Sequence, residues 1–165
     1  MTLAKAQAED EEEVSVRIGS RGFGIVLSVG VLTGCDILTT KPTFQVKLDF
    51  PAEIRVAEPF ALGVDISNPH GSAIKLDSVD VDDALLKGFQ VVSVDPAAAD
   101  TMHVPFLKQR SWSYGRSVPA GGAMRVTFNL RPLNAGRFSG NVDACNPGQD
   151  CTSVFADLVV GPRRP

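Results

Sequence analysis

Apolar and polar residues alternate along most of the chain after residue 43, which is the period of a half-buried β-strand. Clear alternation covers residues 44–50, 60–66, 124–130 and 154–160, and shorter apolar runs fill 54–56, 74–81, 89–94 and 138–144. Proline, glycine and asparagine turns separate these runs at spacings near ten residues. No long amphipathic helix is predicted, although residues 83–87 allow one helical turn. The pattern predicts an all-β sandwich or barrel of seven to nine short strands.

Two segments fit this pattern less well. Residues 97–99 and those that follow read as a loop, and residues 106–114 form a less regular stretch that contains Phe106, Trp112 and Tyr114. His70 and His103 both fall at positions that read as loops.

Three sequence stretches resemble parts of bacterial immunoglobulin-like domains. Glu58-Pro-Phe-Ala-Leu-Gly-Val-Asp-Ile-Ser-Asn68 is similar to their B strand, and the stretches that begin at Gly121 and Gly136 are similar to their last strands. The resemblance implies an immunoglobulin-like antiparallel sandwich over residues 44–161, followed by a short tail at 162–165. The resemblance supports a fold and assigns no active-site residues to this chain.

The chain carries no charge between Arg21 and Asp36. This apolar run is too short for a helix that spans a bilayer, which needs about 20 residues. Arg17 and Arg21 precede the run and small residues end it, as in a secretory signal peptide.

The end of this run, Leu32-Thr33-Gly34-Cys35, resembles the lipobox of bacterial lipoproteins. The resemblance implies a diacylglyceryl group on the Cys35 thiol, cleavage before this cysteine, and frequent acylation of the new amino terminus. Two or three acyl chains hold a protein stably on a membrane, whereas one chain holds it marginally. We therefore expect an extension and signal peptide at 1–34, a lipidated cysteine with linker at 35–43, and a lipid-anchored location outside the cytoplasm. Whether the inner or the outer membrane holds the anchor stays open.

Two other interpretations of this segment remain open: a buried apolar segment with Cys35 in a core, and an anchor that crosses the membrane without cleavage. Residues 1–13 are acidic and unlike the positive start of a signal peptide. Initiation at Val14 or Val16 would give a signal of ordinary length.

With Cys35 lipidated, Cys145 and Cys151 remain, and an Asn-Pro-Gly turn lies between them. Outside the cytoplasm such a close pair predicts a disulfide. A redox pair is less compatible, because thioredoxin-type chemistry uses two intervening residues and an adjoining helix. Zinc needs about four ligands, and His70 and His103 lie far from the pair in sequence.

The net charge of −3 arises largely from residues 1–13, so the remainder has no basic footprint of a nucleic-acid binder. Acidic residues cluster in two places, Asp80-Val-Asp82-Asp83 and Asp143-Ala-Cys-Asn146 with Asp150. The first cluster reads as a solvated strand end, and the second as turn polarity or, alternatively, a calcium site. No nucleophile elbow or phosphate-binding loop is present. We expect no catalytic residue, no cofactor, no metal and no small-molecule substrate.

Residues 104–116 contain the only tryptophan and the only tyrosine of the chain together with several basic side chains. Trp112, Tyr114, Arg110 and Arg116 are candidates for a partner-binding patch. The alternative, which we prefer for the two aromatics, is that Trp112 and Tyr114 point inward and fill the core.

Three functions are compatible with these features. The first is a non-catalytic binding or accessory module of the cell envelope that engages a protein partner. The second is a structural envelope lipoprotein without a discrete ligand site. The third, which the motifs favour least, is a small envelope enzyme.

Overall fold

The computed structural model describes residues 42–164, and the lipobox with Cys35 lies outside this range. Ten strands and one short helix follow one another within it. They are β1 (Gln45–Asp49), β2 (Ile54–Arg55), β3 (Phe60–Ser67), β4 (Ile74–Asp82), α1 (Asp83–Leu86), β5 (Phe89–Asp95), β6 (Asp100–Val104), β7 (Gln109–Val118), β8 (Ala123–Pro132), β9 (Gly136–Cys145) and β10 (Cys151–Gly161).

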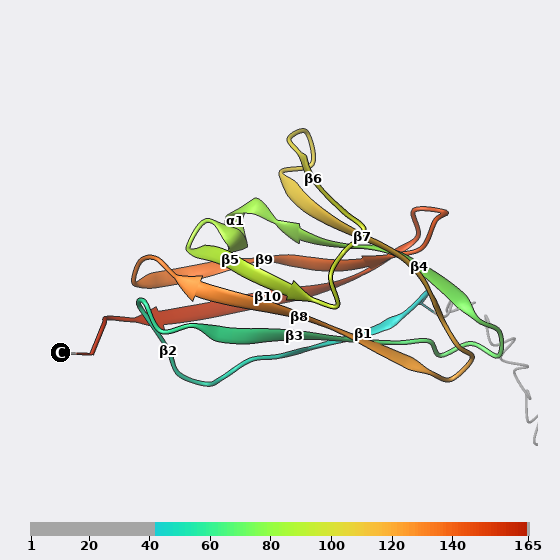
Figure 1. Cartoon of the computed structure of the whole chain (residues 1–165), viewed down its shortest axis with the longest axis horizontal. Helices are drawn as coiled ribbons and strands as arrows, with labels where there is room; N and C mark the ends of the chain where they lie inside the picture. Colours follow the sequence, from blue (N-terminus) through green and yellow to red (C-terminus); the bar gives the residue numbers. More distant parts are fainter. Residues whose placement is uncertain (1–41, 165) are drawn as a thin grey trace, which may run out of the picture. The chain divides into compact units, whose positions relative to one another are not determined.

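The strands form two sheets that face each other (Figure 1). The four-stranded sheet has the order β1-β3-β8-β5, and the six-stranded sheet has the order β2-β10-β9-β4-β7-β6. Every neighbouring pair is antiparallel except β2 with β10. The all-β sandwich predicted from the alternation is therefore confirmed, with ten strands where seven to nine are predicted.

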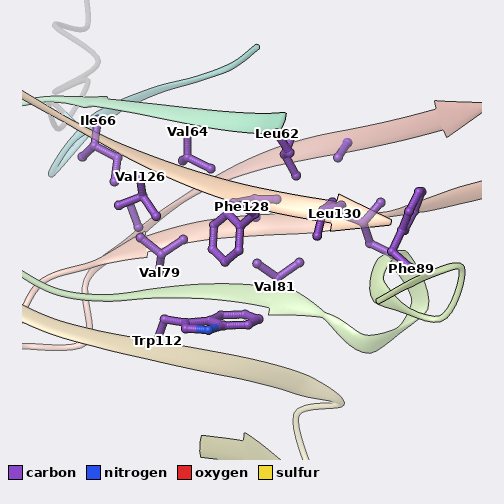
Figure 2. Close-up of a cluster of buried hydrophobic side chains, with 14 of the residues drawn as sticks. Leu62, Val64, Ile66, Val79, Val81, Phe89, Trp112, Val126, Phe128 and Leu130 are labelled. Carbon is purple, nitrogen blue, oxygen red and sulfur yellow. The ribbon is translucent and has the colours of Figure 1, made fainter. Parts of the chain in front are cut away.

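The core lies between the two sheets and consists of the inward side chains of the alternating strands. Figure 2 shows Val79 and Val81 of β4 and Trp112 of β7 opposite Val126 and Phe128 of β8. The rings of Trp112 and Phe128 meet edge to face, with centroids 4.8 Å apart. Such aromatic pairs add to the stability that area burial provides.

A β-bulge interrupts the pairing of β7 with β4. Two residues of β7, Tyr114 and Gly115, lie opposite the single residue Asp77 of β4, so the register shifts between Leu76 and Ser78. Gly115 has φ +60°, which a glycine adopts readily in a bulge of this kind. The buried residues of β7, Trp112, Tyr114 and Val118, keep their even spacing across the bulge. The stretch looks irregular in sequence because its first part is the loop between β6 and β7, where Phe106 and Leu107 are exposed.

The prediction of a loop after residue 99 is wrong for residues 100–104. Residues 100–104 read as a loop, but they form the outermost strand of the six-stranded sheet and pair with β7. His103 is therefore a strand residue, whereas His70 lies in the turn after β3. The β6 side chains are largely exposed, so the apolar alternation that marks a half-buried strand is missing here.

Asn68 holds one end of the sandwich together. Its side chain is buried, and Nδ2 donates hydrogen bonds to the carbonyl oxygens of Ser72, Val118 and Pro119 at 2.8, 3.0 and 3.1 Å. Its Oδ1 accepts from the backbone N–H of His70 at 2.9 Å. One side chain therefore joins the turn after β3 to the end of β7.

No helix within residues 42–164 has the length and apolar character needed to cross a membrane.

Candidate functional site

The outer face of the six-stranded sheet contains a groove. Because side chains alternate along a strand, the inward positions of Val79 and Val81 place Ser78 and Asp80 on the outside. The groove has a volume of about 260 Å³. We call it the outer groove, and its lining residues are Asp77, Ser78, Asp80, Met102, Val104, Phe106, Leu107, Gln109, Ser111, Ser113 and Gln149.

Two acids, Asp77 and Asp80, line the outer groove, and further acids lie beside it. The register of β4 and β9 places Asp80 directly opposite Asp143. Gln109 of β7 links the neighbouring acids, because its Nε2 donates to Asp143 Oδ2 at 2.9 Å and to Asp82 Oδ1 at 3.1 Å. The other oxygen of Asp82 accepts from the backbone N–H of Asn141 at 2.7 Å. These carboxylates therefore share neutral donors.

Asp80 is held in an unfavourable state for a carboxylate. Burial raises the pKa of the Asp80 carboxyl, and the nearby negative charges of Asp143 and Asp77 raise it further. Hydrogen bonds from the hydroxyls of Ser111 and Ser78 oppose this shift in part. Asp80 Oδ1 and Asp143 Oδ1 are buried and have no hydrogen-bond partner among the described residues. Such an arrangement leaves acceptor capacity of both carboxyls unused beneath the surface.

One wall of the outer groove is apolar and exposed. Phe106 is 84% exposed, Met102 58% and Leu107 56%. All three belong to β6 or to the loop between β6 and β7, which extends away from the two sheets in Figure 1. Large apolar side chains gathered at a groove are typical of surfaces that contact a partner.

Local hydrogen bonds order this loop. Leu107 N–H donates to the carbonyl oxygen of Val104 and Lys108 N–H to that of Pro105, both at 3.2 Å. The carbonyl oxygen of Lys108 in turn accepts from Asp83 N–H at 2.8 Å. A second hollow of about 330 Å³, lined by Asp82, Asp83, Ala84, Leu107 and Lys108, lies where the loop meets α1. The loop is therefore tied to the body of the sandwich at its base.

The aromatic candidates from the sequence do not form a binding surface. Trp112 is 4% exposed and Tyr114 is 6% exposed, so both belong to the core. Burial raises the pKa of Tyr114 to about 12. Arg110 and Arg116 are exposed, but neither lines the outer groove. The four residues therefore form no common patch. The rings of Trp112 and Tyr114 point inward by the ordinary alternation of a strand, as the preferred alternative expects.

The cysteine prediction agrees with the structure, in which Cys145 and Cys151 form a disulfide. The two cysteines are opposite each other at the ends of β9 and β10. The lipidation expected at Cys35 falls on a residue outside the described range and stays a prediction.

The two acidic clusters lie differently from what the sequence suggests. Asp80 lines the outer groove, and Asp80, Asp82 and Asp83 are all part-buried, so the first cluster is not a fully solvated strand end. Asn146 and Asp150 bond to each other within the turn before β10, at 3.0 Å from Asp150 N–H to Asn146 Oδ1, while Asp143 bonds to Gln109. Within residues 42–164 no group of three or more acidic, histidine or cysteine side chains is arranged to hold a metal ion.

Sequence reasoning missed most of the groove. It selected the aromatic residues of 104–116 and overlooked Met102 and Leu107. A signal was present, because Val104-Pro-Phe-Leu107 places large apolar residues side by side without a strand or helix period. Gln109 carries no such signal, since its importance comes from the acids of two other strands.

Comparisons with known proteins give a fold and no family. No protein-family model matches the chain, and no curated protein matches it. A cohesin module from a family 33 glycoside hydrolase of Clostridium perfringens is similar in structure, with a TM-score of 0.52 and 11% identity, over 74% of this chain and 100% of that one. The CARDB domain of a Pyrococcus furiosus protein, in complex with di-metal ions, has a TM-score of 0.48 and 15% identity, over 73% of this chain and 89% of that one. At this level of identity the cohesin likeness concerns the fold alone, and together with the two facing sheets it identifies residues 42–164 as an immunoglobulin-like β-sandwich.

Proposed function

We propose that this chain is a lipid-anchored, non-catalytic binding module of a bacterial cell envelope, and that its sandwich engages a protein partner at the outer groove. The observation that carries the binding function is the exposed apolar wall of Met102, Phe106 and Leu107 beside a polar groove. An isolated exposed apolar residue is ordinary on a protein surface, but three at one groove are not.

The anchor rests on the lipobox Leu32-Thr33-Gly34-Cys35. The Cys145–Cys151 disulfide supports export, because disulfides persist in oxidising compartments outside the cytoplasm. Replacement of Cys35 by Ser should remove palmitate labelling and release the protein from the membrane fraction. Unchanged labelling of the Cys35→Ser protein would contradict the anchor while leaving the groove unaffected.

The binding function is tested by site-specific photo-cross-linking in native membranes. A photoreactive residue at position 106 should give one defined cross-linked protein. The matched control is position 155, because Phe155 is 64% exposed on β10 and does not line the groove. The same set of adducts from both positions, or none from position 106, would contradict binding at the groove and favour a structural lipoprotein without a discrete site.

The similar cohesin module belongs to a larger protein, a glycoside hydrolase. A role as an accessory module is compatible with this likeness, although the likeness concerns the fold. The function therefore rests on the surface of this chain and on its own lipobox.

A further inference from the structure

The two cysteines of the disulfide lie in different surroundings. Cys145 is the last residue of β9 and is 1% exposed, whereas Cys151 is the first residue of β10 and is exposed. Thiol–disulfide exchange begins when an external thiolate attacks one sulfur of the bond, so access decides which sulfur is attacked. The sulfur that a thiol in solution reaches is therefore that of Cys151.

The buried sulfur lies against an acid. Sγ of Cys145 is 3.5 Å from Oδ2 of Asp80, across the pairing of β9 with β4. Three more acids lie close by in the chain: Asp77 on β4, Asp143 on β9, and Asp150 directly before Cys151. None of these four acids forms an ion pair with a lysine, arginine or histidine among residues 42–164. The charge beside the buried sulfur is therefore negative and has no paired cation.

Reduction that starts at Cys151 requires the sulfur of Cys145 to leave. The external thiolate forms a bond to Sγ of Cys151 and breaks the S–S bond, and the electron pair of that bond goes to Sγ of Cys145. The leaving group is then a buried thiolate 3.5 Å from a carboxylate oxygen. Burial and a neighbouring like charge both disfavour a charged group, and a poorly stabilised thiolate leaves slowly. Both features therefore slow the exchange.

We propose that the folded chain protects this disulfide against thiol exchange, because a thiol reaches only Cys151 and the sulfur that must leave, Cys145, is buried against the carboxylate of Asp80. This protection does not depend on the proposed binding function. It does bear on the outer groove, because the disulfide closes the turn that contains the groove residue Gln149. Sγ of Cys151 lies 3.6 Å from the carbonyl oxygen of Gln149. In surroundings that contain thiols, this turn therefore keeps its place at the groove.

The first test is the rate of reduction by dithiothreitol, followed by alkylation of the freed thiols and mass spectrometry. The full chain carries Cys35→Ser, so that Cys145 and Cys151 are its only cysteines. One thiol of the reagent attacks the protein disulfide and the second then closes a ring, so that the reagent becomes a cyclic disulfide and the protein a dithiol. We expect the folded chain to be reduced at least about tenfold more slowly than the chain unfolded in urea, where neither burial nor Asp80 acts on the leaving sulfur.

Asp80→Asn isolates the effect of the carboxylate. It should speed reduction of the folded chain at least about fivefold, since a like charge 3.5 Å from the leaving sulfur is removed. Burial and the neighbouring acids raise the pKa of the Asp80 carboxyl, so the variant should be at least as stable as the unaltered chain. Reduction that required global unfolding would then become no faster. The matched control is Asp157→Asn on β10, whose surface ion pair with Arg137 should leave the rate unchanged.

A second test locates the attacked sulfur without any change at Asp80. Glutathione is added to the Cys35→Ser chain, the reaction is stopped with acid, and the free thiol is alkylated with N-ethylmaleimide in urea. Fragment-ion mass spectra should place glutathione on Cys151 and the maleimide on Cys145. Glutathione on Cys145, equal reduction rates for the folded and unfolded chains, or a rate that Asp80→Asn leaves unchanged or lowers would each overturn the inference.

Discussion

Replacement of Trp112 by Ala tests whether this side chain supports the core or a binding surface. Trp112 is 4% exposed and packs edge to face on Phe128 at 4.8 Å. A buried tryptophan removes about 150–250 Å² from water, which at about 25 cal/mol per Å² corresponds to roughly 4–6 kcal/mol. A compact denatured state lowers this figure, and measured Trp→Ala losses are about 3–5 kcal/mol. We therefore expect the free energy of unfolding to fall by about 4 kcal/mol.

The assay is urea unfolding followed by far-ultraviolet circular dichroism, because the variant has no tryptophan left for fluorescence. With a urea slope of about 2 kcal/mol per M, the midpoint should fall by about 2 M. The control is Phe106→Ala, which should change stability by less than about 0.5 kcal/mol, since Phe106 is 84% exposed. A loss below about 1 kcal/mol for Trp112→Ala, or an equal loss for Phe106→Ala, would refute the assignment of Trp112 to the core.

Three further predictions concern stability and ionisation. Asn68→Ala should cost about 2–3 kcal/mol in urea unfolding, because three backbone carbonyl oxygens lose their donor, whereas Ala at the exposed Asn134 should be neutral. Gly140→Ala should cost about 1–3 kcal/mol, because the added Cβ would lie 2.7 Å from a Cβ of β4, while Gly71→Ala meets no atom within 4 Å and should cost far less. The pKa of Tyr114 is raised from 10.0 to about 12, so the unfolded chain loses this proton first and stability should fall as pH rises from 10 to 12. Ultraviolet titration of this single tyrosine checks the shift, and a midpoint near pH 10 in the folded protein would contradict it.

A fifth prediction concerns the ionisation of Asp80. Burial and two neighbouring acids raise the pKa of Asp80, so its ionised form costs free energy at neutral pH. Since the carboxyl is only partly buried, solvent reduces this cost, and Asp80→Asn should stabilise the fold by less than about 1 kcal/mol. Urea unfolding at neutral pH measures the change. A clear loss of stability would show that the ionised Asp80 carboxylate supports the fold, against this expectation.

The sequence alone determined the strands and their buried faces wherever one face of a strand meets the core. Alternation over residues 60–66 and 124–130 predicts β3 and β8, and the inward residues Val64, Val126 and Phe128 are indeed buried. The Cys145–Cys151 disulfide follows from the turn residues between two strands, which is also local information. Local patterns suffice here because the pleat places every second side chain on the same face.

Only the tertiary structure decided where the candidate site lies. The bulge at Gly115 depends on how β7 pairs with β4. The groove likewise depends on strand order, because Asp80 of β4 and Met102 of β6 are distant in sequence and line it together. Pairing between distant strands has no local signature in a single sequence, so the meeting of these acidic and apolar side chains at one groove became visible only when the sheets were assembled.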